Sequence, residues 1–139
     1  MTDRLRAGII GAGFIGGVHA HAVRAAGGEV TRVAASRPDR SKEAAARLGA
    51  DAAAPSGEAL IDADDVDVVH VCTPNSLHVA LARRALAAGK PVVCEKPLAT
   101  TLDDARELAA IAGGQVATVP FVYRFYPAVR DIRARVRGV

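Results

Sequence analysis

The sequence of 139 residues has no tryptophan, only two cysteines and few aromatic side chains, which make up 4% of the chain. Cys72 and Cys94 each lie inside an apolar run, so they are typical of buried free thiols and exclude a disulfide framework. No apolar run approaches the length that crosses a bilayer. The chain shows no signal-peptide pattern at its start. We therefore expect a cytoplasmic protein with no membrane partner.

An excess of positive charge is also lacking over most of the chain. The net charge is +3, and residues 121–139 hold five arginines against a single aspartate, so the rest of the chain is close to neutral. A globally basic nucleic-acid-binding protein would not show this distribution of charge. We interpret the basic end as one solvated helix face and expect no nucleic-acid partner.

Half of the residues are hydrophobic, and short apolar runs alternate with longer helical patterns. Nearly continuous apolar runs are typical of parallel strands that are covered on both faces. The predicted strands are Arg6–Ile10, Val30–Ala35, Val66–Cys72, Pro91–Cys94 and Gln115–Val119, with Ala52–Ala54 as a weaker candidate. The predicted helices are Ile15–Ala26, Arg40–Leu48, Leu77–Ala88 and Leu102–Ala112.

The ends of these helices carry recognisable signals. Gly49 and Gly89 stand just past two helices, where a left-handed residue is favoured. Asn75 and Ser76 are N-cap residue types before a third helix. Thr101 with Asp104 resembles a capping box.

Strict alternation of strands and helices predicts the α/β class, with a doubly wound parallel sheet of the Rossmann type. The expected strand order is 3-2-1-4-5-6. In that order a ligand crevice lies at the carboxyl ends of the first and fourth strands.

Gly11-Ala12-Gly13-Phe14-Ile15-Gly16 is a G-x-G-x-x-G motif between a predicted strand and a predicted helix, which is the context that dinucleotide binding requires. Gly11 allows a tight turn, Gly13 lets the backbone approach a pyrophosphate, and Gly16 lets the helix pack on the strand. Phe14 and Ile15 supply apolar wall. The free N–H groups of the helix N-terminus favour phosphate binding.

The end of the second strand bears on the choice of cofactor. NAD-specific sites place Asp or Glu there to bind the ribose 2′-hydroxyl. This sequence has Ser36 and Arg37, which can hydrogen-bond a 2′-phosphate. We predict that NADP is favoured over NAD. Asp39 is close enough to keep NAD as the alternative, and Arg37 can also be a plain solvated loop residue.

Three polar clusters follow the later strands: Thr73-Pro74-Asn75, Glu95-Lys96-Pro97 and Tyr123-Arg124. Each is expected at the carboxyl edge of the sheet, beside the nicotinamide end of the crevice. Lys96 can donate or accept a proton where partial burial and a nearby cofactor make its neutral form accessible, and Glu95 can orient it. An exposed ion pair in a loop is the alternative for Glu95 and Lys96.

The glycine motif, Cys72-Thr73-Pro74-Asn75 with His78, and residues 89–98 with their Glu-Lys-Pro sequence, in this order, closely resemble the Gfo/Idh/MocA family of oxidoreductases. The resemblance continues through Tyr123-Arg124-Phe125-Tyr126-Pro127. It implies hydride transfer between nicotinamide and a sugar, polyol or related substrate. It also implies proton transfer by Lys96, a nicotinamide site lined by Asn75 and Glu95, and Arg124 near the cofactor or substrate.

The family also has a second, α+β domain that binds substrate and usually forms the dimer interface, and this chain has no counterpart of it. We therefore expect residues 1–120 to form the NAD(P)-binding domain and residues 121–139 to begin the connection to the missing domain. On this interpretation the chain is truncated and inactive alone, and the full-length protein is a homo-oligomer. The alternative is a nucleotide-binding or redox-sensing module without chemistry.

The four histidines lack the spacing of a metal site, and we predict no metal. His19 and His21 fall in the first predicted helix and His70 in a strand. His78 is interpreted as a cap or as a residue that supports the cofactor site from behind. The peptide bond between Lys96 and Pro97 is a candidate for the cis isomer.

Overall fold

The computed structural model describes residues 4–137. The strands are Arg6–Ile10 (β1), Glu29–Ala34 (β2), Ala52–Ala53 (β3), Val68–Val71 (β4), Val92–Cys94 (β5) and Ala117–Thr118 (β6). The helices are Phe14–Ala25 (α1), Pro38–Leu48 (α2), Gly57–Ile61 (α3), His78–Ala87 (α4), Leu102–Ala112 (α5) and Pro127–Arg137 (α6). Asn75–Leu77 (η1) and Val122–Phe125 (η2) are short 3-10 helices.

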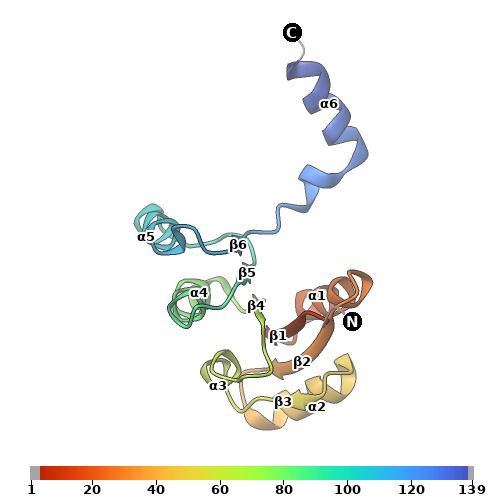
Figure 1. Ribbon diagram of the computed structural model, residues 1–139, viewed down its shortest axis with the longest axis vertical. Helices are drawn as coiled ribbons and strands as arrows, with labels where there is room; N and C mark the ends of the chain where they lie inside the picture. Colours follow the sequence, from red (N-terminus) through yellow and green to blue (C-terminus); the bar gives the residue numbers. More distant parts are fainter. Residues whose placement is uncertain (1–3, 138–139) are drawn as a thin grey trace.

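The strands form one parallel sheet in the order β3-β2-β1-β4-β5-β6, which confirms the predicted class and strand order. Helices α1 and α2 cover one face of the sheet, and α3, α4 and α5 cover the other (Figure 1). Strand order reverses between β1 and β4, so the loops after these strands diverge to opposite faces and leave a crevice between them.

Two apolar clusters hold the layers together. One joins β1 and β2 to α1 and α2 through residues such as Ile9, Val23 and Val33. The larger one packs α3, α4 and α5 on the opposite face, around Leu60 and Leu81. Because aromatic residues are scarce, small aliphatic side chains fill both clusters and the helices can lie close to the sheet.

Most of the predicted helix ends are confirmed. Gly49 and Gly89 have φ of +64° and +71°, as left-handed residues past a helix should. The Thr101 hydroxyl oxygen accepts the Asp104 N–H at 3.1 Å, at the start of α5. Helix α2 begins at Pro38, two residues before the predicted Arg40, since proline fits the first turn of a helix.

The expected caps at Asn75 and Ser76 are wrong. The Leu77 N–H donates to the Pro74 carbonyl at 3.0 Å, so the chain is already turning at Asn75. Helix α4 then begins directly from this 3-10 turn, with Leu77 at the cap position and no side-chain cap. A residue inside the turn cannot cap a helix that follows it without a break.

The chain leaves the sheet after β6 and runs through η2 into α6, which projects away from the rest of the molecule (Figure 1). The large apolar side chains of this segment are exposed; they are Phe121, Val122, Tyr123, Phe125, Tyr126, Val129, Ile132 and Val136. The arginine-rich end does form an exposed helix, as the sequence indicated.

Candidate functional site

The glycine motif forms the turn between β1 and α1, and two of its glycines are required by space. A Cβ on Gly11 would lie 2.3 Å from the Cys72 carbonyl oxygen, and the φ of +101° disfavours any other residue. A Cβ on Gly16 would lie 2.1 Å from the Gly11 carbonyl oxygen. Gly11 therefore allows the loop to pack against the end of β4, and Gly16 allows α1 to pack against the loop.

Gly13 differs from both. Its φ is −73°, which any residue adopts, and a Cβ there would meet no atom within 4 Å. It is the N-cap residue of α1, and no side chain caps the first turn or places an acidic group in it. The open space at Gly13 therefore faces free N–H groups at the positive end of a helix, which is the environment that a phosphate needs.

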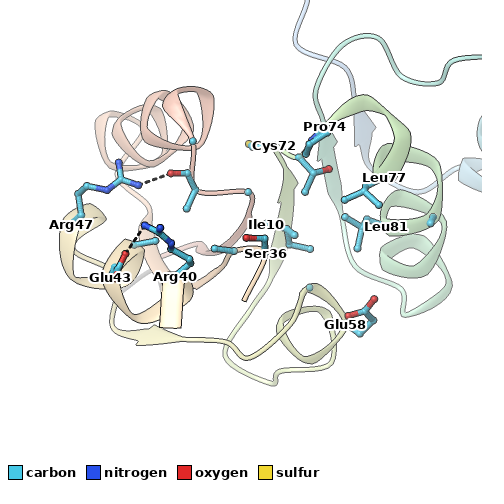
Figure 2. A pocket seen from close by; sticks show the side chains of 18 residues that line it. Ile10, Ser36, Arg40, Glu43, Arg47, Glu58, Cys72, Pro74, Leu77 and Leu81 are labelled. Carbon is cyan, nitrogen blue, oxygen red and sulfur yellow. Dashed lines mark hydrogen bonds and ion pairs between the residues drawn. The ribbon is translucent and has the colours of Figure 1, made fainter. Parts of the chain in front are cut away.

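A cavity of about 760 Å³ opens in front of this loop, between the carboxyl ends of β1, β2 and β4. This volume lies within the range of small-molecule and cofactor sites. Figure 2 shows side chains from α2, the β2 end, α3 and α4 around it. Of the residues predicted for the cofactor, those in its lining are Gly11, Gly13, Ser36, Thr73 and Pro74.

Two arginines that sequence reasoning missed line the same cavity. Arg40 pairs with Glu43 at 3.2 Å, and Arg47 donates to the Ala12 carbonyl of the glycine loop (Figure 2). They lie seven residues apart on α2, which places them on one helix face. Arg37, which the sequence favoured, is exposed, pairs with Asp39 at 3.4 Å, and is not among the lining residues.

Thr73 carries a further sign of an incomplete site. Its hydroxyl oxygen is buried and has no hydrogen-bond partner among the residues that the structure describes. A buried hydroxyl without a partner is unfavourable. Thr73 also lines the cavity, so a polar ligand there can supply the missing bond.

The remaining predicted residues lie outside the lining of this cavity. Gly16 lies beneath the loop and Ile15 packs against the α1 cluster, whereas Phe14 is 88% exposed. Arg124 lies in the exposed η2 segment. Asn75 is exposed at the start of η1.

His78 is fully buried and joins two loops. Its Nδ1 lies 2.8 Å from the Pro97 carbonyl oxygen, and its Nε2 lies 2.9 Å from the Thr73 carbonyl oxygen. The imidazole thus fixes the loop after β4, which lines the cavity, against the loop after β5, which carries Lys96. This position fits the supporting role that the sequence indicated better than direct contact with a ligand.

The loop after β5 holds Glu95 and Lys96 in different environments. Glu95 is buried, and its Oε2 accepts the Lys96 backbone N–H at 3.0 Å. The Lys96 side chain is exposed, at the carboxyl edge of the sheet. The peptide bond between Lys96 and Pro97 is cis, as the sequence suggested. Glu95 therefore anchors the backbone beneath an accessible amine.

Glu95 also has a partner that sequence reasoning did not find. Its Oε1 lies 3.1 Å from Nε2 of His19, and Nδ1 of His19 lies 2.9 Å from Nδ1 of His70. Burial, together with the neighbouring His19, lowers the pKa of His70 to about 4. His70 is therefore neutral near pH 7.

The two cysteines are free and buried, as expected. Burial, followed by the nearby Glu95 carboxylate, raises the pKa of each thiol to about 12. Thiols in this state are poor nucleophiles near neutral pH. Within residues 4–137, no three His, Cys, Asp or Glu side chains are placed to hold a metal ion. None of the described helices is long and apolar enough to cross a membrane.

Comparison with known proteins agrees with this geometry. Residues 5–121 match the model of the Gfo/Idh/MocA oxidoreductase family, described as having an NAD-binding Rossmann fold. The chain belongs to this family. It is 39% identical, over 99% of its length, to inositol 2-dehydrogenase of Acidothermus cellulolyticus, of which it covers 42%.

Two solved structures extend the comparison. Levoglucosan dehydrogenase in complex with NADH and levoglucosan has a TM-score of 0.90 and 31% identity, covering 98% of this chain and 40% of that one. A 3-ketoreductase from Actinomadura kijaniata in complex with NADP and TDP-benzene has a TM-score of 0.86 and 34% identity, covering 98% and 44%. The chain thus spans about two fifths of the length of these relatives.

Proposed function

We propose that this chain is the cofactor-binding part of a dehydrogenase or reductase that transfers hydride between nicotinamide and a carbon of a sugar, polyol or related substrate. The observation that carries the proposal is the open space at Gly13, at the uncapped N-terminus of α1 and in the lining of the cavity. The relatives named inositol 2-dehydrogenase and levoglucosan dehydrogenase support the substrate class.

The residues present fit a dinucleotide. The N–H groups at the start of α1 would bind the pyrophosphate, and Ser36 with α2 would receive the adenosine ribose. The unpartnered Thr73 hydroxyl would find a hydrogen bond toward the nicotinamide half. When bound, the nicotinamide supplies or accepts the hydride.

Lys96 is the residue of this chain that we assign to proton transfer. Its amine is accessible at the carboxyl edge of the sheet, while its backbone is held by Glu95. A lysine in this position donates a proton to the substrate oxygen during reduction and accepts one during oxidation. Asn75, at the start of η1 on the same edge, is proposed to line the nicotinamide site, and Glu95 to support that site from beneath Lys96.

For the cofactor we propose a preference for NADP over NAD. Ser36 and the guanidinium groups of Arg40 and Arg47 line the end of the cavity beside β2. Glu43 also lines it, but its charge is offset by Arg40 at 3.2 Å. Cationic side chains with a hydroxyl group favour a 2′-phosphate over a bare ribose hydroxyl.

Fluorescence titration of the chain with NADPH and NADH tests cofactor binding, and a panel of polyols and sugars with each cofactor tests catalysis. We expect binding of both cofactors, tighter for NADPH. We expect no measurable turnover by this chain alone, because Lys96 is solvent-exposed and nothing in residues 4–137 fixes a substrate opposite it. If the chain binds neither cofactor, the proposed function is wrong. If it binds NADH more tightly than NADPH, only the proposed preference for NADP is wrong.

A further inference from the structure

Three polar side chains from separate elements form a hydrogen-bonded chain beneath the lysine. His19 lies on α1, His70 on β4 and Glu95 directly after β5. His19 and Glu95 are each 7% exposed, and His70 is partly buried. None of the three belongs to the lining of the cofactor cavity.

The chemistry of these groups fixes the direction of the bond to Glu95. A carboxylate only accepts, so Nε2 of His19 carries the proton that faces Glu95 at 3.1 Å. The two facing Nδ1 atoms, 2.9 Å apart, need one donor and one acceptor, and a neutral His70 can take either part.

Other titratable groups facing this chain leave its charge unchanged near neutral pH. Cys72, directly after β4, and Cys94 on β5 lie close to Glu95, and their buried thiols stay protonated because their pKa is raised to about 12. The second oxygen of Glu95 accepts the Lys96 backbone N–H, and the Lys96 side chain points to solvent. Glu95 therefore depends on His19 for its side-chain partner.

We propose that His19 is a positioning residue for Lys96: the chain from His70 through His19 holds the Glu95 carboxyl group fixed beneath the Lys96 backbone. The proposal rests on the proposed role of Lys96 in proton transfer. Because His19 is on the helix whose first turn would receive the pyrophosphate, the same contact joins the cofactor-binding helix to the lysine loop. The contact between His19 and Glu95 then helps to position both the cofactor-binding helix and Lys96.

The first test needs no variant. Nitrogen-15 NMR of the chain labelled in histidine reports which ring nitrogen carries the proton. We expect a protonated Nε2 for His19, and a proton on only one of the two facing Nδ1 atoms, near pH 7. A proton on Nδ1 of His19 with Nε2 bare would overturn the proposal, since Glu95 would then face a ring nitrogen that cannot donate.

The second test compares His19→Gln, which keeps a donor toward Glu95, with His19→Leu, which keeps bulk but has none. Without a donor on His19, the Glu95 carboxyl group loses its side-chain partner and holds the Lys96 backbone N–H less firmly. We expect deuterium labelling of the Lys96 backbone N–H, normalised to that of Lys42, to be about tenfold faster in His19→Leu than in the wild type.

The outcomes separate positioning from packing. Wild-type labelling of Lys96 in His19→Gln with faster labelling in His19→Leu supports the proposal. Equal labelling in both folded variants would show that His19 only fills space and would overturn it. NADPH titration of the same samples keeps the two proposals distinct. A wild-type chain that does not bind NADPH contradicts the proposed function. The histidine tautomers measured by NMR test the hydrogen-bonded chain independently of cofactor binding.

Discussion

Replacement of Gly13 by valine separates cofactor binding from folding. In the free chain a Cβ at this position meets no atom within 4 Å, and the backbone φ of −73° suits any residue. Replacing glycine at a compatible position changes stability by about 0.4–1 kcal/mol in the favourable direction, through the unfolded state. The preference for glycine over valine at a helix N-cap works in the opposite direction. The variant should therefore fold, with a stability within about 1 kcal/mol of the wild type.

Binding should suffer because the space at Gly13 is the approach of the pyrophosphate to the N-terminus of α1. A valine side chain keeps a phosphate away from these N–H groups. Each charge-assisted hydrogen bond that is lost costs about 1.5–3 kcal/mol, or roughly 10–150-fold in Kd. Gly13→Ala, with less bulk, should show a smaller loss of the same kind.

Fluorescence titration with NADPH, beside thermal unfolding, measures both effects. Gly17→Ala is the matched control, because it lies one turn further along α1, where a Cβ would be 3.8 Å from Leu48. It should gain up to about 1 kcal/mol in stability and leave affinity unchanged. Gly16→Ala should lose stability, since its Cβ would be 2.1 Å from the Gly11 carbonyl oxygen. An unchanged Kd in a folded Gly13→Val variant would refute the placement of the pyrophosphate.

Three further predictions concern the surroundings of the cavity. Arg40→Gln should weaken NADPH binding by about 10–150-fold and NADH binding much less. Arg37→Gln, outside the lining, should change the ratio of the two dissociation constants little. Titrations with both cofactors check this, and a larger effect at Arg37 would show that Arg37 binds the 2′-phosphate. The pKa of His70 is about 4 in the folded chain and about 6.5 when unfolded, so only the unfolded chain binds this proton between those values and the free energy of unfolding falls as pH drops through that window. The loss amounts to about 3–4 kcal/mol, since a difference of one in pKa corresponds to about 1.4 kcal/mol, and it should be absent in His70→Gln, as denaturant titrations at several pH values can show. His78→Leu should cost about 1–3 kcal/mol, because a carbonyl group of Thr73 or Pro97 loses the imidazole N–H that is donated to it; an unaltered denaturation midpoint would argue against a bridging role.

The sheet could be predicted from the sequence because its signals are local. Apolar runs mark the strands, and the Gly11–Gly16 motif fixes where β1 turns into α1. Strand order then follows from the handedness of the crossovers. Helix α3 was missed because five residues are too few for a helical period. Its signal was Ser56, whose hydroxyl accepts the Ala59 N–H at 3.1 Å.

The residues at the adenosine end were harder to place, since side-chain direction depends on where a helix begins. Arg37 follows β2 and was therefore expected at the cavity. Because α2 starts at Pro38, Arg37 is its N-cap residue, with an exposed side chain. Arg40 and Arg47, two turns apart, share the face that lines the cavity. Knowledge of the helix start alone would have moved the prediction from Arg37 to Arg40.

The histidine chain was missed for a different reason, because its contacts join residues 51 and 76 positions apart. The sequence nevertheless contained one signal. Gly16, Ala20 and Val23 form the buried stripe of α1, and His19 lies on the same stripe. A buried imidazole needs partners for its ring nitrogens, and the strands that α1 covers were already known from the predicted order. On β4, His70 is the polar residue among valines, and Glu95 directly follows the neighbouring β5. Helical periodicity and strand order together would therefore have placed His19 between them, although not the direction of its hydrogen bonds.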